Sequence, residues 1–201
     1  SQYDGVIIVG IDNASSHGKF SRMDEYSPWP RNTSFSLPGW DPDVDYSGGK
    51  GALYVDFIVD TLKNYIDSNF RTLPDRNNTA IAGSSMGAYI SLFAAILRQD
   101  VFSKVGVFSL ALWFNDSAML NFIQDNNIVE NLTLYLDVGT QETSGMREDF
   151  PEIYISGAEK LCVSLRKQRN VTMDYHLWGG NTHSESAWAK RFPEMLKLFY
   201  C

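Results

Sequence analysis

The sequence has little cysteine, little histidine and no long apolar run. Its two cysteines are Cys162, in a segment expected to be helical, and Cys201 at the last position. We therefore expect neither a structural disulfide nor a thiolate metal site. No apolar run approaches the roughly eighteen residues that a membrane-spanning helix needs, and the start, SQYDGVIIVG, lacks the basic region of a signal peptide. These absences predict a soluble protein and favour the cytoplasm.

An excess of basic residues is also missing. The net charge is -7 and the isoelectric point is near 4.9, which argues against nucleic acid or an anionic membrane as a partner. The 201 residues are 44% hydrophobic and 20% charged. This balance suits one globular domain with a sizeable core, and no internal repeat or domain boundary is visible.

Short β-branched runs alternate with longer segments of helical periodicity. The expected strands are 5–11, 80–82, 105–109, 132–138 and 171–178, and the expected helices are 51–70, 86–97, 116–124, 151–169 and 185–199. The first strand, GVIIVGI, is expected to be fully buried and parallel. This alternation predicts an α/β fold with a doubly wound, mostly parallel sheet and helices on both faces.

Two segments between the first two expected strands differ in character. Residues 12–50 contain four prolines and several aromatic residues, and a connection this long is usually functional or disordered. The aromatic residues favour an ordered loop over the mouth of a site. Residues 51–70 carry apolar residues at helical spacing. The expected apolar face consists of Leu53, Phe57, Ile58, Leu62 and Ile66.

The most informative stretch is TAIAGSSMGAYISLFAAIL, from Thr79 to Leu97. A short apolar run enters the pattern G-x-S-x-G and a continuous apolar segment leaves it, which predicts a strand, a tight turn and a helix. A serine on such a turn has strained backbone angles, and its hydroxyl is exposed at the end of a sheet. Positions 83 and 87 are expected to require glycine because a side chain there would collide with the turn. Ser85 is therefore the candidate nucleophile.

A general base for this serine must come from three histidines. His183 follows the last expected strand, where the loop Gly179–Thr182 leads it past the strand end. Active sites of such sheets form at the carboxyl ends of the strands, so His183 is the candidate base. His176 alternates with apolar neighbours inside the strand and is expected to pack there. His17 lies in the long loop and is a weaker candidate.

The acid that orients the histidine should lie at a strand end between the serine and the histidine. Glu142, three residues beyond Gly139, fulfils this condition. Asp137 is the competitor, but it lies within the apolar run, where its carboxylate would need buried partners. Glu148 and Asp149 precede Pro151 and suit the start of a helix. Glu142 is the favoured acid.

Four motifs agree in order and spacing with a known family. IAGSSMGAYIS, VFSLALWF, LYLDVGTQE and GGNTHSESAW resemble the putative-esterase family of α/β-hydrolases, which includes esterase D-like enzymes, feruloyl and acetyl xylan esterases, and enterobactin-type siderophore esterases. The resemblance runs from residue 5 to the end. It implies the α/β-hydrolase fold, with Ser85 as nucleophile, His183 as base and Glu142 as acid. It also implies that the backbone N–H of Met86 is one oxyanion donor.

The resemblance extends to residues around the expected pocket. Asn13 and Arg22 lie in the stretch that follows the corresponding strand in the family, and both are candidate substrate-binding residues. An Arg22–Glu25 pair could shape the pocket, although a role in pinning the loop suits Glu25 better. Trp113 matches a family aromatic near the site, and a core aromatic explains it equally well.

One feature of the family has no counterpart before Gly5. There, an earlier strand ends in a His-Gly or Asp-Gly pair and its loop supplies the second oxyanion N–H. Residues 1–201 thus resemble a single esterase domain that is incomplete at its N-terminus, without the family's N-terminal strands. A sheet without that strand has an unpaired edge, so we expect self-association through this edge.

These features together predict a serine esterase that acts through an acyl-enzyme and needs no metal or organic cofactor. Its expected partner is a small-molecule ester, and the substrate stays open among an acylated carbohydrate, an aromatic acyl ester and a siderophore ester. An acyltransferase would use the same three residues. A binding module that has kept the fold but lost turnover is the alternative from a different class.

Overall fold

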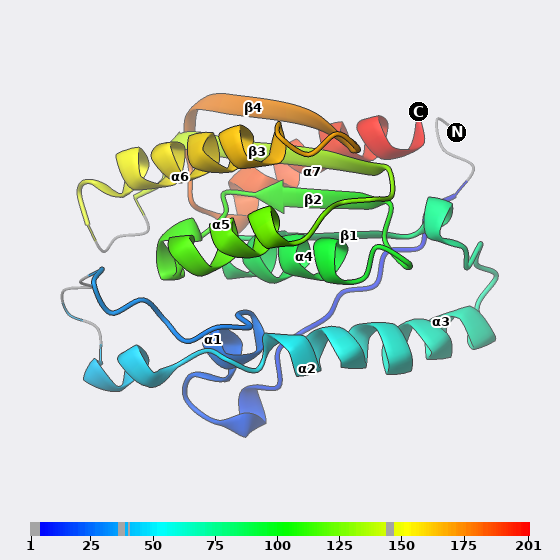
Figure 1. The fold of residues 1–201 in the computed structure, drawn as a ribbon, viewed down its shortest axis with the longest axis horizontal. Helices are drawn as coiled ribbons and strands as arrows, with labels where there is room; N and C mark the ends of the chain where they lie inside the picture. The colour runs from blue at the N-terminus through cyan, green and yellow to red at the C-terminus, as the bar shows by residue number, and fades with distance from the viewer. Residues whose placement is uncertain (1–4, 36–38, 40, 144–146) are drawn as a thin grey trace.

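The computed structural model describes residues 5–35, 39, 41–143 and 147–201. Its centre is a parallel sheet in the order β1-β2-β3-β4 (Figure 1). The strands are β1 (Ala80–Ser84), β2 (Lys104–Phe108), β3 (Leu132–Gln141) and β4 (Val171–Thr182). The parallel sheet predicted from the sequence is confirmed. Because all four strands run the same way, their carboxyl ends meet at one edge of the sheet.

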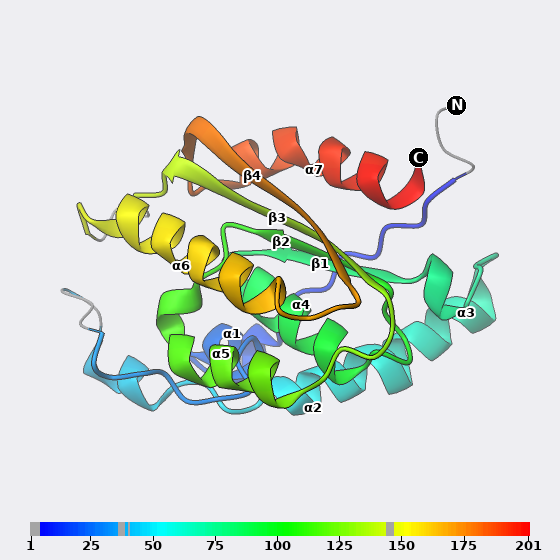
Figure 2. The same ribbon diagram turned by 45° about the horizontal axis from the view of Figure 1, so that its top comes forward.

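Helices cover both faces of this sheet, as expected. They are α1 (Ser21–Glu25), α2 (Gly51–Asp56), α3 (Asn64–Asn69), α4 (Met86–Leu97), α5 (Asp116–Asp125), α6 (Phe150–Leu165) and α7 (Glu185–Tyr200). Figure 2 shows α7 on one face of the sheet and α4 and α6 on the other. The sheet therefore separates two layers of apolar packing.

The strands bury alternate side chains in these two layers, as strand geometry requires. Val107 and Leu136 belong to the larger cluster, which packs under α4 and α6. Phe108 and Tyr135 face α7 instead, where they pack with Met195 and related residues. The positions of β2 and β3 in the middle of the sheet explain why almost every residue in these strands is buried.

Residues 51–69 form one continuous helix, as predicted, but its buried face differs from the expected one. A π-helical stretch, Phe57–Lys63, joins α2 to α3. The buried side chains are those of Tyr54, Val55, Ile58 and Val59, whereas Leu53 and Phe57 are exposed. The prediction for Leu53 and Phe57 is wrong because the helix turns its Tyr54 side toward α1 and α4, where Tyr54 packs against Tyr26.

Residues 5–11 are not the fully buried strand that the sequence predicts. The segment forms no ladder with any described strand, and Ile7 and Ile8 are 51% and 65% exposed. It runs beside β1 in the same direction (Figures 1 and 2), but a cavity separates the two. A strand needs a hydrogen-bonded neighbour, and the described chain offers none at this position.

Candidate active site

Ser85 lies at the turn between β1 and α4, as the sequence predicts. Its φ of 58° is uncommon for a residue with a side chain and marks local strain. Backbone hydrogen bonds hold the turn, because the Ser85 N–H donates to the Phe108 carbonyl at 2.9 Å and the Ser85 carbonyl accepts from the Ala111 N–H at 3.3 Å. Both the N–H and the carbonyl of Ser85 are thus hydrogen-bonded to the segment at the end of β2 and just after it.

The two glycines of the turn behave differently. A Cβ added to Gly83 would lie 2.3 Å from the carbonyl oxygen of Gly87, so this position cannot carry a side chain. A Cβ added to Gly87 would meet no atom within 4 Å. The expectation of collision is therefore correct for Gly83 and wrong for Gly87, which borders a cavity instead of packed protein.

Glu142 and His183 are in direct contact although 41 residues separate them. Each follows the end of its strand, β3 for Glu142 and β4 for His183. Nδ1 of His183 lies 2.7 Å from Oε2 of Glu142. A carboxylate only accepts, so Nδ1 carries the proton of this hydrogen bond, and Nε2 keeps its lone pair in the neutral ring.

A register shift in the β3–β4 ladder creates this contact. Gly139 pairs with Trp178, but Gln141 pairs with Thr182, so β4 has gained residues relative to β3. Such bulges re-aim the side chains that follow them. The sequence predicts a loop over 179–183, whereas the strand in fact continues to Thr182.

The second oxygen of Glu142 is held by two donors. Oε1 accepts a hydrogen bond from the Ser109 hydroxyl at 2.6 Å and another from the Gly139 N–H at 2.6 Å. The Ser109 oxygen itself accepts from Trp188 Nε1 at 2.9 Å and from Arg191 Nη2 at 3.0 Å. Glu142 and Ser109 are completely buried. This network fixes the carboxylate in one orientation, with Oε2 toward His183.

The imidazole of His183 is clamped between aromatic rings. The Tyr154 ring lies 4.7 Å away between centroids, and the Trp188 ring meets it edge-on at 4.8 Å. The Tyr154 hydroxyl lies 3.5 Å from Nε2 of His183. The side chain of His183 is only 11% exposed, so it has little freedom to rotate away from Glu142.

Asp137, the competing acid, has a different environment. It is fully buried, its Oδ2 lies 3.1 Å from Nε of Arg191, and the Tyr135 hydroxyl donates to it at 3.0 Å. Burial raises the pKa of Asp137 to about 6, and the charge of Arg191 opposes that rise. The buried partners that the sequence argument required are thus present, and the carboxylate in contact with His183 is that of Glu142.

The other two histidines lie outside this network. His176 on β4 contacts Asp174 at 2.9 Å and stacks on Trp178 with ring centroids 5.6 Å apart. His17 is largely exposed, with Nδ1 3.4 Å from Glu25. Glu25 also accepts a hydrogen bond from the Ala14 N–H at 2.9 Å. Glu25 therefore pins the long loop.

The candidate pocket residues fall into two separate cavities. Asn13 and Arg22 line a large cavity of about 1060 Å³. Asn13 donates to Ser21 at 3.0 Å, and the Arg22 guanidinium lies over the Tyr26 ring at 5.8 Å. Trp113 lines a smaller cavity of about 280 Å³. The structure therefore does not bring Trp113 together with Asn13 and Arg22.

Met86 is the first residue of α4. The first N–H groups of a helix have no intrahelical partner and point out of its positive end. The Met86 N–H therefore suits an anion beside Ser85.

In the described part of the chain, no group of three His, Cys, Asp or Glu residues could hold a metal ion. None of its helices has the length and apolar character to cross a bilayer.

Sequence reasoning missed Ser109 and Arg191. A signal for Arg191 existed, because it shares one stripe of the final helix with Ala187, Met195 and Phe199, all of which are buried. A charged residue on an apolar stripe needs a buried partner, and here the partner is Asp137. Ser109 gave no comparable signal, since a serine at the end of a strand is ordinary in a sequence.

The family described as "Putative esterase" matches residues 2–199, and the chain belongs to this family. Membership supports an ester hydrolase. Among curated relatives, the uncharacterized protein YbbA of Bacillus subtilis (strain 168) is 24% identical over 198 residues. The match spans 97% of this chain and 73% of YbbA. This relative is thus longer than the present chain.

Three solved structures illustrate the similarity of fold. The BES protein from Bacillus cereus has a TM-score of 0.71 at 18% identity, with 92% of this chain and 67% of that protein covered. An IroE-like serine hydrolase from Shewanella oneidensis gives 0.69 at 20%, covering 89% and 56%. The siderophore hydrolase EstA from Aspergillus nidulans gives 0.65 at 16%, covering 92% and 68%. The chain shares their α/β-hydrolase fold.

Proposed function

We propose that this member of the esterase family hydrolyses carboxylic esters through an acyl-enzyme formed on Ser85. The observation that carries the proposal is the contact of 2.7 Å between Glu142 and His183. This contact lies at the carboxyl edge of the sheet, where β1 also ends, directly before Ser85. A strained serine, an imidazole with its lone pair on Nε2 and a buried carboxylate are the three groups that this chemistry requires.

In the proposed reaction, the Ser85 hydroxyl attacks the ester carbonyl and His183 Nε2 accepts its proton. Glu142 stabilises the imidazolium through Nδ1, and the network around Ser109 keeps the carboxylate in place. The Met86 N–H stabilises the negative oxygen of the tetrahedral intermediate, a contribution typically worth about 10²–10³ in rate. His183 then protonates the leaving alcohol. Water attacks the acyl-enzyme in the same way and releases the acid.

Hydrolysis of p-nitrophenyl acetate and butyrate tests this proposal. Ser85→Ala should abolish the hydrolysis, and His183→Ala should reduce it to a similar extent because the two side chains act as one unit. Ser84→Ala removes a neighbouring hydroxyl at the end of β1 and serves as the matched control, which should keep its activity. Equal rates in Ser85→Ala and the parent chain would contradict the proposal, as would a parent chain without hydrolysis.

For the substrate, we propose an ester with an aromatic or siderophore-type acyl group. Support comes from the similar structure of EstA, a siderophore hydrolase, and from the aromatic residues Phe35 and Trp113, whose ring centroids lie 5.5 Å apart at the smaller cavity. A comparison of methyl ferulate with methyl acetate tests this specificity. A higher kcat/KM for the ferulate is expected, and a preference for the acetate would contradict it.

A further inference from the structure

The hydroxyl of Tyr154 lies beside the reacting nitrogen of His183. Tyr154 is near the start of α6, and its hydroxyl oxygen is 3.5 Å from Nε2 of His183. Because Nδ1 of His183 carries the proton of the hydrogen bond to Glu142, Nε2 is an acceptor, and a hydroxyl at this place can only donate to it. At 3.5 Å this hydrogen bond is weak, so Nε2 remains able to take the Ser85 proton.

Packing fixes the position of this hydroxyl. Tyr154 is 2% exposed, and its ring packs against the imidazole of His183 and, with centroids 5.7 Å apart, against the ring of Phe150. It belongs to the buried cluster that also contains Met86, the residue after Ser85. Figure 2 shows α6 on the same face of the sheet as α4, which begins at Met86. The hydroxyl is therefore held beside the proposed base before any substrate arrives, and a donor held in this way needs no reorganisation during the reaction.

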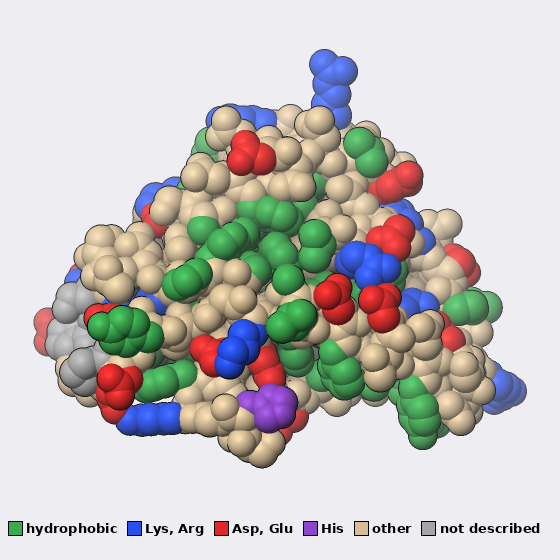
Figure 3. Space-filling view, turned by 60° about the horizontal axis from the view of Figure 1, so that its bottom comes forward, with side chains coloured by type: hydrophobic (Ala, Val, Ile, Leu, Met, Phe, Trp, Pro, Cys, Tyr) green, Lys and Arg blue, Asp and Glu red, His purple; other side chains and the backbone are tan. Residues whose placement is uncertain are grey.

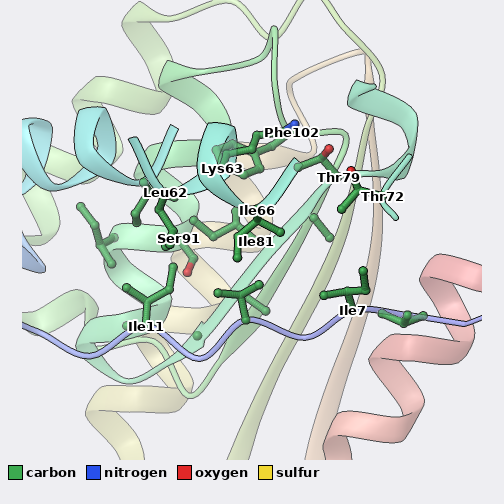
Figure 4. A pocket seen from close by; sticks show the side chains of 18 of the residues that line it. Ile7, Ile11, Leu62, Lys63, Ile66, Thr72, Thr79, Ile81, Ser91 and Phe102 are labelled. Carbon is green, nitrogen blue, oxygen red and sulfur yellow. The ribbon is translucent and has the colours of Figure 1, made fainter. Parts of the chain in front are cut away.

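The large cavity does not supply a hydroxyl to His183. Figure 3 looks onto the side of α1 and α2 and shows apolar side chains in a hollow, with charged side chains at its margin. The wall of the large cavity includes the hydroxyl side chains of Thr72, Thr79 and Ser91 (Figure 4). His183 and Tyr154 are not among the described residues that line it. The hydroxyl at Nε2 therefore comes from α6 and not from this cavity.

The oxygen that leaves an ester must come close to the same nitrogen. After Ser85 has attacked, Nε2 of His183 carries the proton and delivers it to the leaving oxygen within hydrogen-bond distance. Since Nε2 and the Tyr154 hydroxyl are 3.5 Å apart, an oxygen about 2.8 Å from Nε2 lies about 2.7–3.2 Å from the hydroxyl when the angle between the two directions at Nε2 is about 50–60°. Protonated Nε2 no longer accepts, so the Tyr154 hydroxyl can turn its proton to this oxygen.

We propose that Tyr154 is a further catalytic residue, whose hydroxyl donates a hydrogen bond to the leaving alcohol oxygen when the tetrahedral intermediate collapses. This role rests on the proposed esterase function. In this step the bond between the carbonyl carbon and the alcohol oxygen breaks, its electron pair goes to that oxygen, and the proton comes from Nε2 of His183. Tyr154 keeps its own proton throughout. The hydrogen bond matters most for esters of alkyl alcohols, because their alkoxides are strong bases, and the site is therefore suited to such substrates.

Two esters of one acid, ethyl butyrate and p-nitrophenyl butyrate, test the proposal. Both give the same acyl-enzyme, and kcat/KM reports the step that forms it, in which only the leaving group differs. In Tyr154→Phe, kcat/KM for ethyl butyrate should fall at least about tenfold, because a single donor to a developing negative oxygen typically contributes more than this. The value for p-nitrophenyl butyrate should stay within about twofold of the parent, because p-nitrophenolate leaves without a proton.

Tyr175→Phe is the matched control. Tyr175 packs against the same buried cluster as Tyr154, and its hydroxyl has no hydrogen-bond partner among the described residues, so both rates should be unchanged. An equal loss on both esters in Tyr154→Phe, which a purely structural role would give, or an unchanged rate on ethyl butyrate would overturn the proposal. So would a parent chain that cleaves p-nitrophenyl butyrate but not ethyl butyrate. A parent chain that cleaves neither ester would contradict the proposed function itself, and the role of Tyr154 with it.

Discussion

The Ser109 hydroxyl donates a hydrogen bond of 2.6 Å to Oε1 of Glu142, the carboxylate whose other oxygen contacts His183. Ser109 follows β2, which lies between β1 and β3, the strands that precede Ser85 and Glu142. Its φ of 46° places it among the strained positions that usually mark a functional constraint. Ser109 therefore links the end of β2 to the proposed acid and, through Arg191, to α7.

Ser109→Ala should lower kcat for p-nitrophenyl butyrate by about 10–100-fold, because small misplacements of catalytic groups have effects of this size. KM should change little, since Ser109 is fully buried and does not meet substrate. Ser103→Ala, another buried serine beside β2, is the matched control and should retain its kcat. If the two variants lose activity equally, the hydrogen bond to Glu142 has no special role.

Gly139→Ala should disturb the proposed acid directly. The added Cβ would lie 2.2 Å from the Asn181 carbonyl oxygen and 2.9 Å from Oε1 of Glu142, so β4 or the carboxylate must shift. We expect a loss of esterase activity of at least tenfold and a lower Tm. Gly179→Ala is the matched control: Gly179 lies on β4 near Asn181, and its added Cβ would meet no atom within 4 Å. An active Gly139→Ala enzyme with the Tm of Gly179→Ala would contradict the observed packing.

Asp137 should make an unusual contribution to the pH dependence of stability. Burial raises its pKa from 3.8 to about 6 in the folded protein. Between about pH 4 and 6 the native state then holds a proton that the unfolded state has lost, so the Asp137 contribution to the unfolding free energy falls as pH rises. Below this window both states are protonated, and above it both are ionised.

Urea unfolding of the parent chain and Asp137→Asn at pH 4, 5, 6 and 7 measures this contribution. The free energy of unfolding of the parent minus that of the variant should decrease with pH, by up to about 3 kcal/mol across the window. Taking the difference at each pH cancels the contributions of all other carboxylates, because these are the same in both chains. A difference that increases with pH would show that Arg191 lowers the pKa of Asp137 more strongly than burial raises it.

The local elements of the site could be predicted from the sequence because their signals are local. The pattern around Ser85 requires a turn between strand and helix, and the structure has one. The placement of Glu142 and His183 after neighbouring strands predicts that they share one sheet edge, and they are in fact in contact. Strand order and strand ends carried this inference.

Long-range packing could not be predicted in the same way. The run of residues 5–11 has every property of a buried strand, yet it is exposed because the described chain supplies no neighbour for it. Ser109 bonds to Glu142, 33 positions away, and Gly139 lies against the backbone of Asn181; only the fold brings either pair together. Trp113 and Arg22 line different cavities. This separation likewise follows from packing, and the spacing of the two residues in the sequence does not indicate it.

Labelling with a fluorophosphonate, followed by mass spectrometry of the digested chain, tests the role of Ser85 as nucleophile most directly. Such probes react with a serine only when a neighbouring base activates it. One adduct is expected, on Ser85; it should be lost in His183→Ala and weakened in Ser109→Ala. An adduct on another serine, or a chain that remains unlabelled while its Tm shows it folded, would contradict the assignment of Ser85 as nucleophile.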